Sequence, residues 1–403
     1  MPKALIVTVG TTPDGRSDIL NVLAEDIQAY SPELVVFVAS KESQSHAQKI
    51  ADTAKLAAGT YEFVVLASSH SFDVIFAETN NAIRRLIERG FSADSISVNY
   101  TSGTKVMGSA AVLAALFHQC GQARYIYHET AGRNMTITTQ LEGVSAFREL
   151  SFSRRLIEEM RFQSAHDLLS RIDGSLLSEH DQKAVQCLNG LAKAYSHWDN
   201  FRYAEVLEAL NQLPGDDGLE SRFRIGKDVI EKLSMLAADC AQNRISELTF
   251  ADMMNNAIRR KREGSFDDAV ARIYRALEMI AQWVLKRADV DTDDVDTRRV
   301  PPRDRVSFEA MRSVDDGKLR IGLRKSFELL TILRTPLGLR FEEHEELSHM
   351  LSYRRNSILA HGTTAMNGEE CDNLLAAAKH LFSAEIPNFE ELCHSLQFPW
   401  LRA

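Results

Sequence analysis

The segment Ala4-Leu-Ile-Val-Thr-Val9, followed by Gly10-Thr11-Thr12, decides the fold of the N-terminal part of the chain. It is a short apolar run rich in β-branched residues that ends in a turn, which is typical of a strand buried on both faces of a sheet. Similar runs occur at residues 34–38, 63–66, 95–100, 124–127 and 135–139, and helical spacing of apolar residues occurs at 17–30, 42–57, 72–89 and 104–119. This alternation predicts a mostly parallel sheet with helices on both faces, a Rossmann-like α/β domain over residues 1–145.

Two strand-to-helix loops of this domain carry the residues of a candidate ligand site. In such sheets, ligands bind beyond the carboxyl ends of the strands. The candidates are Gly10, Thr11 and Thr12 in the first loop, and Thr101, Ser102, Gly103, Thr104 and Lys105 in the second. Hydroxyls, backbone N–H groups, a helix N-terminus and a lysine together suit a phosphate group. In the alternative interpretation, Thr101 or Ser102 only caps the following helix and the glycines ease packing.

After about residue 145 the strand signals end and the chain becomes helical. Phe162, Phe201 and Phe266 are each followed by an alanine three residues later and then by an apolar stripe. Alanine at this position lets two helices approach closely, as in stacked helical hairpins. We therefore expect an all-α connector over residues 146–250 and a second all-α domain over 251–403. In the second domain, helices are expected at residues 266–287, 306–334, 342–361, 369–383 and 388–396.

The segment Tyr353-Arg-Arg-Asn-Ser-Ile-Leu-Ala-His-Gly362 places two fixed cations near a titratable base. It is expected to be helical and to end at Gly362. Arg354 lies seven residues before His361, about two helical turns, and Arg355 lies six before it, within reach of a long side chain. The last turn of a helix favours the imidazolium form, which can donate a proton to a leaving oxygen. The segment thus carries the minimum equipment for cutting RNA without a metal.

These two sets of residues each resemble a known family. Arg355-Asn356, then Ser-Ile-Leu-Ala, then His361-Gly362 resembles the Arg-Asn…His signature of HEPN-domain ribonucleases. Thr8-Val-Gly-Thr-Thr12, with Asn99-Tyr-Thr-Ser-Gly-Thr-Lys-Val-Met107, looks like a CARF domain. Together the resemblances suggest a CRISPR-associated ancillary ribonuclease of type III systems. They imply an endoribonuclease acting on single-stranded RNA, with a site completed across a homodimer, and a sensor domain that binds cyclic oligoadenylate.

Roles for individual residues follow from these resemblances. His361 would move a proton to or from the reacting oxygens, Arg355 would stabilise the phosphorane, and Asn356 would orient the phosphate. Arg354 is the alternative for the arginine role. Products with a 2′,3′-cyclic phosphate and a 5′-hydroxyl are expected, with no metal and no cofactor. The eight loop residues from Gly10 to Lys105 would line the cleft for the cyclic oligoadenylate, which acts as an allosteric activator of undetermined ring size.

Composition restricts the remaining choices. The chain has 403 residues, 44% of them hydrophobic, which suits two or three globular domains. No apolar run is long enough to span a membrane, and the N-terminus has no signal-peptide pattern. The five cysteines form no Cys-x-x-Cys pair, so neither a disulfide framework nor a zinc site is expected and a cytoplasmic location is predicted. A net charge of −9 disfavours broad nucleic-acid binding and confines RNA to a local basic patch.

Two other functions are compatible with the same sequence. In the first, the sensor domain itself cleaves the cyclic oligoadenylate, with Thr11, Thr12 and Lys105 positioning a 2′-hydroxyl. In the second, the chain is a nucleotide-responsive regulator without catalysis. The second predicts a DNA-reading element, but no convincing basic recognition helix is present. It also gives no reason for the Arg355…His361 motif.

Overall fold

The computed structural model describes residues 2–11, 18–128, 134–215, 219–343 and 363–402. The chain divides into two compact units. The α/β unit comprises Met1–Leu156 with Asp167–Val185, and the helical unit comprises Ile157–His166 with Gln186–Ala403. The three-domain division with boundaries near residues 145 and 250 stays a prediction.

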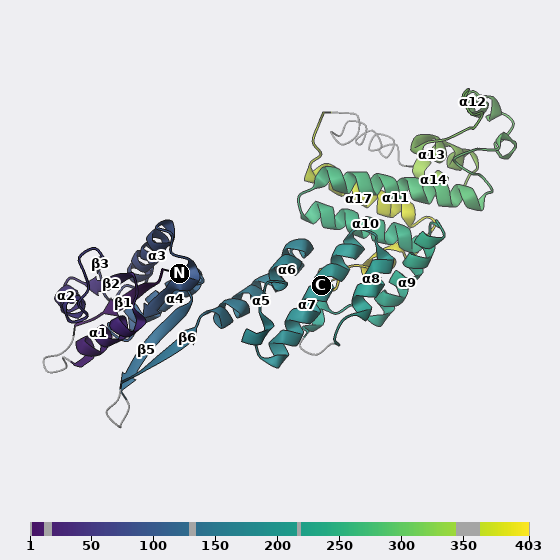
Figure 1. The fold of residues 1–403 in the computed structure, drawn as a ribbon. Coiled ribbons are helices and arrows are strands. Elements are labelled where there is room, and N and C mark those ends of the chain that lie inside the picture. Colours follow the sequence, from purple (N-terminus) through teal and green to yellow (C-terminus); the bar gives the residue numbers. More distant parts are fainter. Residues whose placement is uncertain (1, 12–17, 129–133, 216–218, 344–362, 403) are drawn as a thin grey trace. The chain divides into compact units, whose positions relative to one another are not determined.

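A single twisted sheet forms the centre of the α/β unit (Figure 1). In the described part of the chain it has six strands in the order β3-β2-β1-β4-β5-β6. The strands are β1 (Ala4–Val9), β2 (Leu34–Ser40), β3 (Tyr61–Leu66), β4 (Ile96–Asn99), β5 (Gln122–His128) and β6 (Asn134–Gln140). Strands β1 to β5 pair in parallel, and β6 runs antiparallel to β5. The predicted α/β Rossmann-like sheet, mostly parallel, is confirmed.

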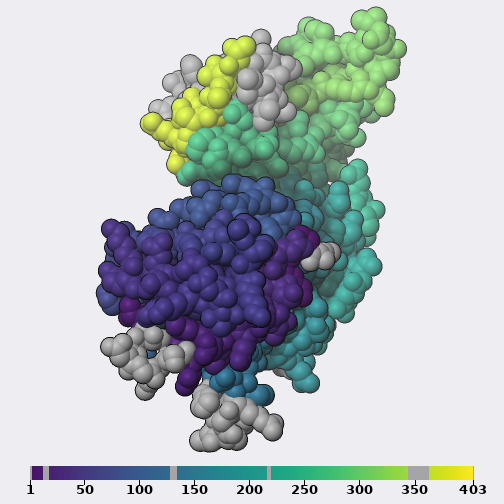
Figure 2. Space-filling view, turned by 60° about the vertical axis from the view of Figure 1, so that its left-hand side comes forward, coloured from purple at the N-terminus to yellow at the C-terminus, as the bar shows by residue number. Residues whose placement is uncertain are grey.

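Alternation along β1 distributes its side chains between two cores. Successive side chains of a strand point to opposite faces. Leu5, Val7 and Val9 pack with residues of α1 (Asp18–Tyr30) and α2 (Gln44–Thr53). Ala4 and Ile6 pack instead with residues of α3 (Phe72–Glu88) and α4 (Lys105–Phe117). Every residue of β1 is buried, which is why its sequence is a continuous apolar run. In the space-filling view, the purple and blue side chains of this unit form a close-packed surface (Figure 2).

In the described residues after β6, the regular elements are helices. They are α5 (Glu142–Glu158), α6 (Phe162–Leu169), α7 (Glu179–Asp199), α8 (Tyr203–Asn211), α9 (Lys227–Ala241), α10 (Glu247–Arg262), α11 (Phe266–Arg287), α12 (Arg305–Glu309), α13 (Leu323–Ile332), α14 (Pro336–Glu342), α17 (Gly368–Phe382) and α18 (Phe389–Ser395). Helices α10 and α11 form the central hairpin of the helical unit, and α11 also packs on α13 and α17 (Figure 1). None of the described helices has both the length and the apolar character required to cross a bilayer.

One predicted helix is wrong. A single helix was expected over residues 306–334, but α12 ends at Glu309 and α13 begins at Leu323. Between them, Asp315-Asp316-Gly317 forms a turn in which Gly317 has φ +69° and Ser313 N–H donates to the Lys318 carbonyl at 2.9 Å. Two aspartates before a glycine are a turn signal, and here they override the apolar spacing on either side. The helix predicted at 342–361 lies outside the described residues from 344 onward.

Candidate functional site

The candidate ligand site of the α/β unit lies where the direction of strand order reverses. Strand β1 is flanked by β2 on one side and by β4 on the other. Consecutive connections therefore leave β1 and β4 toward opposite halves of the sheet, and the loops beyond their carboxyl ends face each other. Ligands of open α/β sheets bind at this position.

The two loops touch through their glycines. A Cβ atom on Gly10 would lie only 2.6 Å from the Cα atom of Gly103, so a side chain at Gly10 would push the loops apart. Gly103 itself has φ +96°, a backbone conformation that favours glycine. Gly10 N–H donates to Ser102 Oγ at 3.2 Å, and the Thr8 hydroxyl donates to the Ser102 carbonyl. Ser102 is buried and fastens the loops together.

The threonines of the second loop hold its shape. Thr104 caps α4, since its Oγ1 accepts from Met107 N–H at 3.1 Å and donates to the Ser69 carbonyl at 2.9 Å. The Thr101 hydroxyl donates to Asn99 Oδ1 at 2.6 Å and accepts from Ile126 N–H at 2.8 Å. These hydroxyls are therefore engaged within the protein. The cap is the one considered from sequence, although Thr104 provides it rather than Thr101 or Ser102.

The buried carboxylate of Asp26 is connected to the second loop by hydrogen bonds. Asp26 of α1 accepts from Asn99 Nδ2 at 2.8 Å and forms an ion pair with Arg124 at 2.5 Å. Thr136 of β6 donates to the same carboxylate at 3.2 Å. Because Asn99 also accepts from Thr101, the network connects α1, β4, β5 and β6 to the loop. Arg124 was the only hint in the sequence, as a charge within an apolar strand.

A pocket of about 560 Å³ opens beside this loop. Its lining residues are Tyr100, Thr101, Gly103, Thr104, Lys105, Gly108, Ser109, Val112 and Tyr125. The rings of Tyr100 and Tyr125 stack with centroids 5.4 Å apart and present an aromatic wall. Lys105 is the first residue of α4, is exposed, and makes no ion pair with any described residue. Its charge and the unpaired N–H groups of the first helical turn suit a phosphate.

The predicted ligand residues thus have different positions. Thr101, Gly103, Thr104 and Lys105 line the pocket, whereas Gly10 and Ser102 join the two loops. Thr11 is exposed in the first loop, and Thr12 lies outside the described residues. The Tyr100/Tyr125 pair and the face of α4 formed by Gly108, Ser109 and Val112 were not predicted from the sequence. Tyr100 adjoins the motif, but nothing in the sequence brings Tyr125 to it.

The predicted nuclease motif, Arg354, Arg355, Asn356 and His361, lies outside the described residues. The structure does describe the chain that follows it. Met366 N–H donates to the carboxylate of Asp267 at 3.2 Å, which ties this chain to the first turn of α11. Asn367 then begins α17 with a capping box in which Asn367 and Glu370 satisfy each other's backbone N–H groups. The segment after the motif is therefore anchored to the central hairpin.

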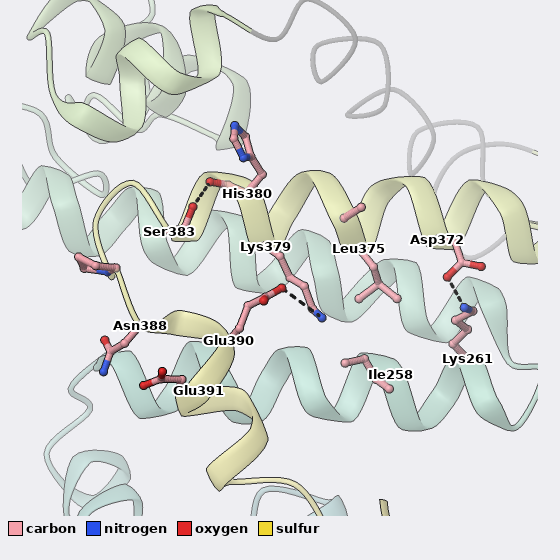
Figure 3. A pocket seen from close by; sticks show the side chains of 12 residues that line it. Ile258, Lys261, Asp372, Leu375, Lys379, His380, Ser383, Asn388, Glu390 and Glu391 are labelled. Carbon is pink, nitrogen blue, oxygen red and sulfur yellow. Dashed lines mark hydrogen bonds and ion pairs between the residues drawn. The ribbon is translucent and has the colours of Figure 1, made fainter. Parts of the chain in front are cut away.

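A pocket of about 830 Å³ lies among α10, α17 and α18 (Figure 3). It is lined by Ile258, Lys261, Asp372, Leu375, Ala376, Lys379, His380, Ser383, Pro387, Asn388, Glu390 and Glu391. Lys261 pairs with Asp372, and Lys379 Nζ lies 4.0 Å from Glu390 Oε1 (Figure 3). Both lysines are thus matched by carboxylates, and Glu391 adds further negative charge. This pocket, hereafter the acidic pocket, does not suit an anionic substrate.

Comparison with protein-family models gives one match for each half of the chain. Residues 18–151 match the model of the Card1 CARF domain, and residues 237–384 match that of the Csm6 HEPN domain. The chain is a CRISPR-associated CARF–HEPN protein. The CARF match includes the loop after β4 and begins after the loop that follows β1. The HEPN match includes the Arg355…His361 motif and supports a ribonuclease.

A comparison with solved structures gives further matches. Enterococcus italicus Csm6 bound to cyclic hexa-2′-fluoro-hexa-dAMP is 15% identical, has a TM-score of 0.47, and is aligned over 100% of both chains. Can2 from Sulfobacillus thermosulfidooxidans in complex with cyclic tetra-adenylate is 13% identical, with a TM-score of 0.24, and covers 50% of this chain and 68% of its own. No curated protein matches the chain in sequence.

Proposed function

We propose that the chain is a metal-independent endoribonuclease that cleaves single-stranded RNA when its CARF domain binds a cyclic oligoadenylate. The observation that carries the proposal is the pocket beside the loop after β4. It combines Lys105, which makes no ion pair with any described residue, and the N-terminus of α4 with the stacked rings of Tyr100 and Tyr125. Phosphates and adenine bases are the two components of an oligoadenylate, and cations with helix N-termini bind the former while aromatic faces stack on the latter.

The catalytic step is assigned to the HEPN motif. The 2′-hydroxyl attacks the neighbouring phosphorus, its proton passes to a base, and the bond from phosphorus to the 5′-oxygen breaks. His361 takes up the first proton or supplies one to the leaving oxygen. Arg355 offsets the charge of the phosphorane, Asn356 orients the phosphate, and Arg354 is the alternative partner for its oxygens. The products are a 2′,3′-cyclic phosphate and a 5′-hydroxyl.

Activation requires a change between two arrangements of a homodimer. A symmetric ring lying across two sensor domains favours one arrangement only if it binds that arrangement more tightly. Exposed apolar side chains on α4 support a partner surface near the pocket, since Leu113 and Phe117 are 45% and 63% exposed. The same helix contributes Gly108, Ser109 and Val112 to the pocket. A ligand in the pocket would therefore contact the same helix that a partner subunit on α4 contacts.

The test is cleavage of a fluorescent single-stranded RNA in EDTA, with and without cyclic tetra- or hexa-adenylate. His361→Ala and Arg355→Ala should each lower the rate about 100-fold or more, as loss of a proton-transfer or charge-stabilising group does. Lys105→Ala should raise the ring concentration for half-maximal activation about tenfold or more, with basal cleavage unchanged, because a charge-assisted phosphate contact is lost. Lys49→Ala, an exposed lysine of α2, is the matched control.

Two outcomes would overturn the proposal. Full activity of His361→Ala would remove the catalytic assignment. A ring that is itself linearised while RNA stays intact would assign the chain to ring degradation instead.

A further inference from the structure

The helical unit contains a second pocket, at the end of α11 opposite to the chain that follows the motif. Its lining residues are Gln242, Asn243, Arg244 and Ile245 from the loop between α9 and α10, and Gln282, Trp283, Lys286 and Arg287 from α11. It has a volume of about 460 Å³. Its described walls contain three cations, three carboxamides and one indole, and no carboxylate. We call it the cationic pocket.

The walls of the cationic pocket are held in place by residues behind them. Arg244 Nε donates to Asp239 at 2.7 Å, and Asp239 is buried. The Arg287 guanidinium lies 4.7 Å from the centre of the Trp283 ring and 3.7 Å from Glu385. Phe250 meets the indole at 78°, with ring centroids 5.7 Å apart. A ligand would therefore find the aromatic surface and two of the cations already positioned, which lowers the entropic cost of binding.

The polar groups that face the pocket still have capacity for a ligand. The side chains of Arg244 and Arg287 are 62% and 60% exposed, so each retains donors beyond its single carboxylate. Within the part of the chain that the structure describes, Lys286 makes no ion pair, and the carboxamides of Gln242, Asn243 and Gln282 make no hydrogen bond. Where such polar groups are scattered over a surface, hydrogen bonds to water are sufficient for them. Their convergence around one indole, without a lining carboxylate, points to a specific ligand class.

We propose that the cationic pocket binds one nucleotide of single-stranded RNA. A base can stack on the exposed part of the indole or on the Arg287 guanidinium that lies over it, the Lys286 ammonium and the Arg244 guanidinium suit a phosphate, and the carboxamides can pair with base edges. The acidic pocket of the same unit has room but carries Asp372, Glu390 and Glu391, so it lacks this complementarity. RNA as the ligand rests on the proposed nuclease function.

The cationic pocket lies far along α11 from the residue that contacts the chain after the motif. Trp283 lies sixteen residues along α11 from Asp267, which contacts the chain after the motif. At about 1.5 Å per residue, the two are roughly 24 Å apart along the helix axis. A nucleotide bound at Trp283 would therefore be remote from Asp267 and from the chain after the motif. The pocket would raise affinity for longer RNA and leave the chemical step unchanged.

The test is binding of a fluorescein-labelled single-stranded RNA to the full chain carrying His361→Ala, without cyclic oligoadenylate, followed by anisotropy. Trp283→Ala should weaken binding about fivefold or more, as loss of one base-stacking platform does, and Trp283→Phe should restore most of it. Lys286→Ala should weaken binding and reduce the salt dependence by about one phosphate contact. Lys379→Ala in the acidic pocket is the matched control and should have no effect. Lys286 is exposed, so its variant reports on the pocket even if Trp283→Ala disturbs the fold.

Unchanged RNA binding in both Trp283→Ala and Lys286→Ala would overturn the assignment. Unlabelled 5′-AMP that displaces the RNA as readily as RNA itself does would assign the pocket to free nucleotides and also overturn it. Weak competition by AMP supports RNA. The binding arm needs no cleavage, so a wild-type chain that binds RNA through Trp283 but does not cut it would refute the nuclease proposal alone.

Discussion

The two units of the molecule each bury an aspartate beside an arginine, but the surroundings of the two pairs differ. In the α/β unit, Asp26 binds Arg124 and Asn99. Asn99 in turn accepts a hydrogen bond from Thr101, which lines the pocket beside the loop after β4. In the helical unit, Asp252 accepts from Trp198 at 2.9 Å and from Tyr203 at 2.8 Å, and Arg259 lies 3.6 Å away. The first network reaches the lining of the pocket beside the loop after β4, and the second ends inside the core.

Arg259 shows how completely the second network is enclosed. Its side chain is fully buried, lies 4.2 Å from the centre of the Phe398 ring, and donates to Asp199 at 2.8 Å. Residues from α7, α10 and the C-terminal segment therefore meet at one guanidinium. Arg124, by contrast, is 11% exposed and has one carboxylate partner. The difference shows that a buried aspartate–arginine pair can either hold a loop beside a pocket or join helices in a core. The further hydrogen bonds of the pair determine which of these it does.

The largest effect is expected from Arg259→Ala. Removing one partner of a buried pair leaves uncompensated carboxylates and costs about 3–5 kcal/mol of unfolding free energy. Arg124→Ala should cost less, about 1–3 kcal/mol, because its site is closer to solvent. All three tryptophans, Trp198, Trp283 and Trp400, belong to the helical unit, so urea unfolding followed by tryptophan fluorescence reports on that unit.

The fluorescence transition should move to lower urea concentration in Arg259→Ala and stay in place in Arg124→Ala. Equal shifts of the urea midpoint in the two variants would mean that the two units unfold as one, and would contradict the expected difference between them. Lys232→Ala, which removes a partly exposed ion pair of α9, is the control for a surface change and should cost at most about 1 kcal/mol.

A sharper test uses two asparagines of equal burial. Asn99 and Asn255 are each 1% exposed, and each carboxamide both donates and accepts. Asn99→Ala and Asn255→Ala should lose similar stability, about 1–3 kcal/mol, because each leaves buried partners unpaired. Only Asn99→Ala should weaken binding of the activating cyclic oligoadenylate, by about tenfold, since Thr101 loses its anchor.

Isothermal titration of the ring with the two variants measures this difference. Equal affinities would mean that the Asp26 network does not position the loop. Weaker binding in Asn255→Ala would instead show that the helical unit contributes to ligand affinity.

The sequence predicted these two regions unequally, for physical reasons. The apolar, β-branched runs identified the strands because a buried parallel strand leaves little room for other residues. The loop motif indicated Thr101, Gly103, Thr104 and Lys105, which adjoin each other along the chain and line one pocket. Their role in ligand binding stays a prediction. Tyr125 and Asp26 were missed, because sheet pairing between distant segments brings them to the loop.

The helical unit was predicted with less detail. Amphipathic spacing located α11, but the residues that meet at Arg259 come from positions as distant as Asp199 and Gln397, and no local pattern brings them together. The prediction of one helix over residues 306–334 failed for a local reason. It gave the apolar spacing on either side more weight than the turn signal at Gly317. Roles for Arg355 and His361 stay predictions.

The smallest expected effect concerns the response of the second network to pH. Burial raises the pKa of Asp252 above its ordinary value, although Arg259 and the hydrogen bonds from Tyr203 and Trp198 oppose the shift. The unfolded chain then releases this proton at about pH 4, before the native state does. Between these two pKa values the native state holds more protons, so this group lowers the unfolding free energy as pH rises, by about 1.4 kcal/mol per unit of pKa difference.

Asp252→Asn cannot titrate and should lack this component. Urea unfolding by tryptophan fluorescence from pH 4 to 7 should therefore show the stability difference between wild type and Asp252→Asn changing across the window in favour of the variant. A difference that stays constant with pH would mean that Arg259 keeps Asp252 ionised despite its burial.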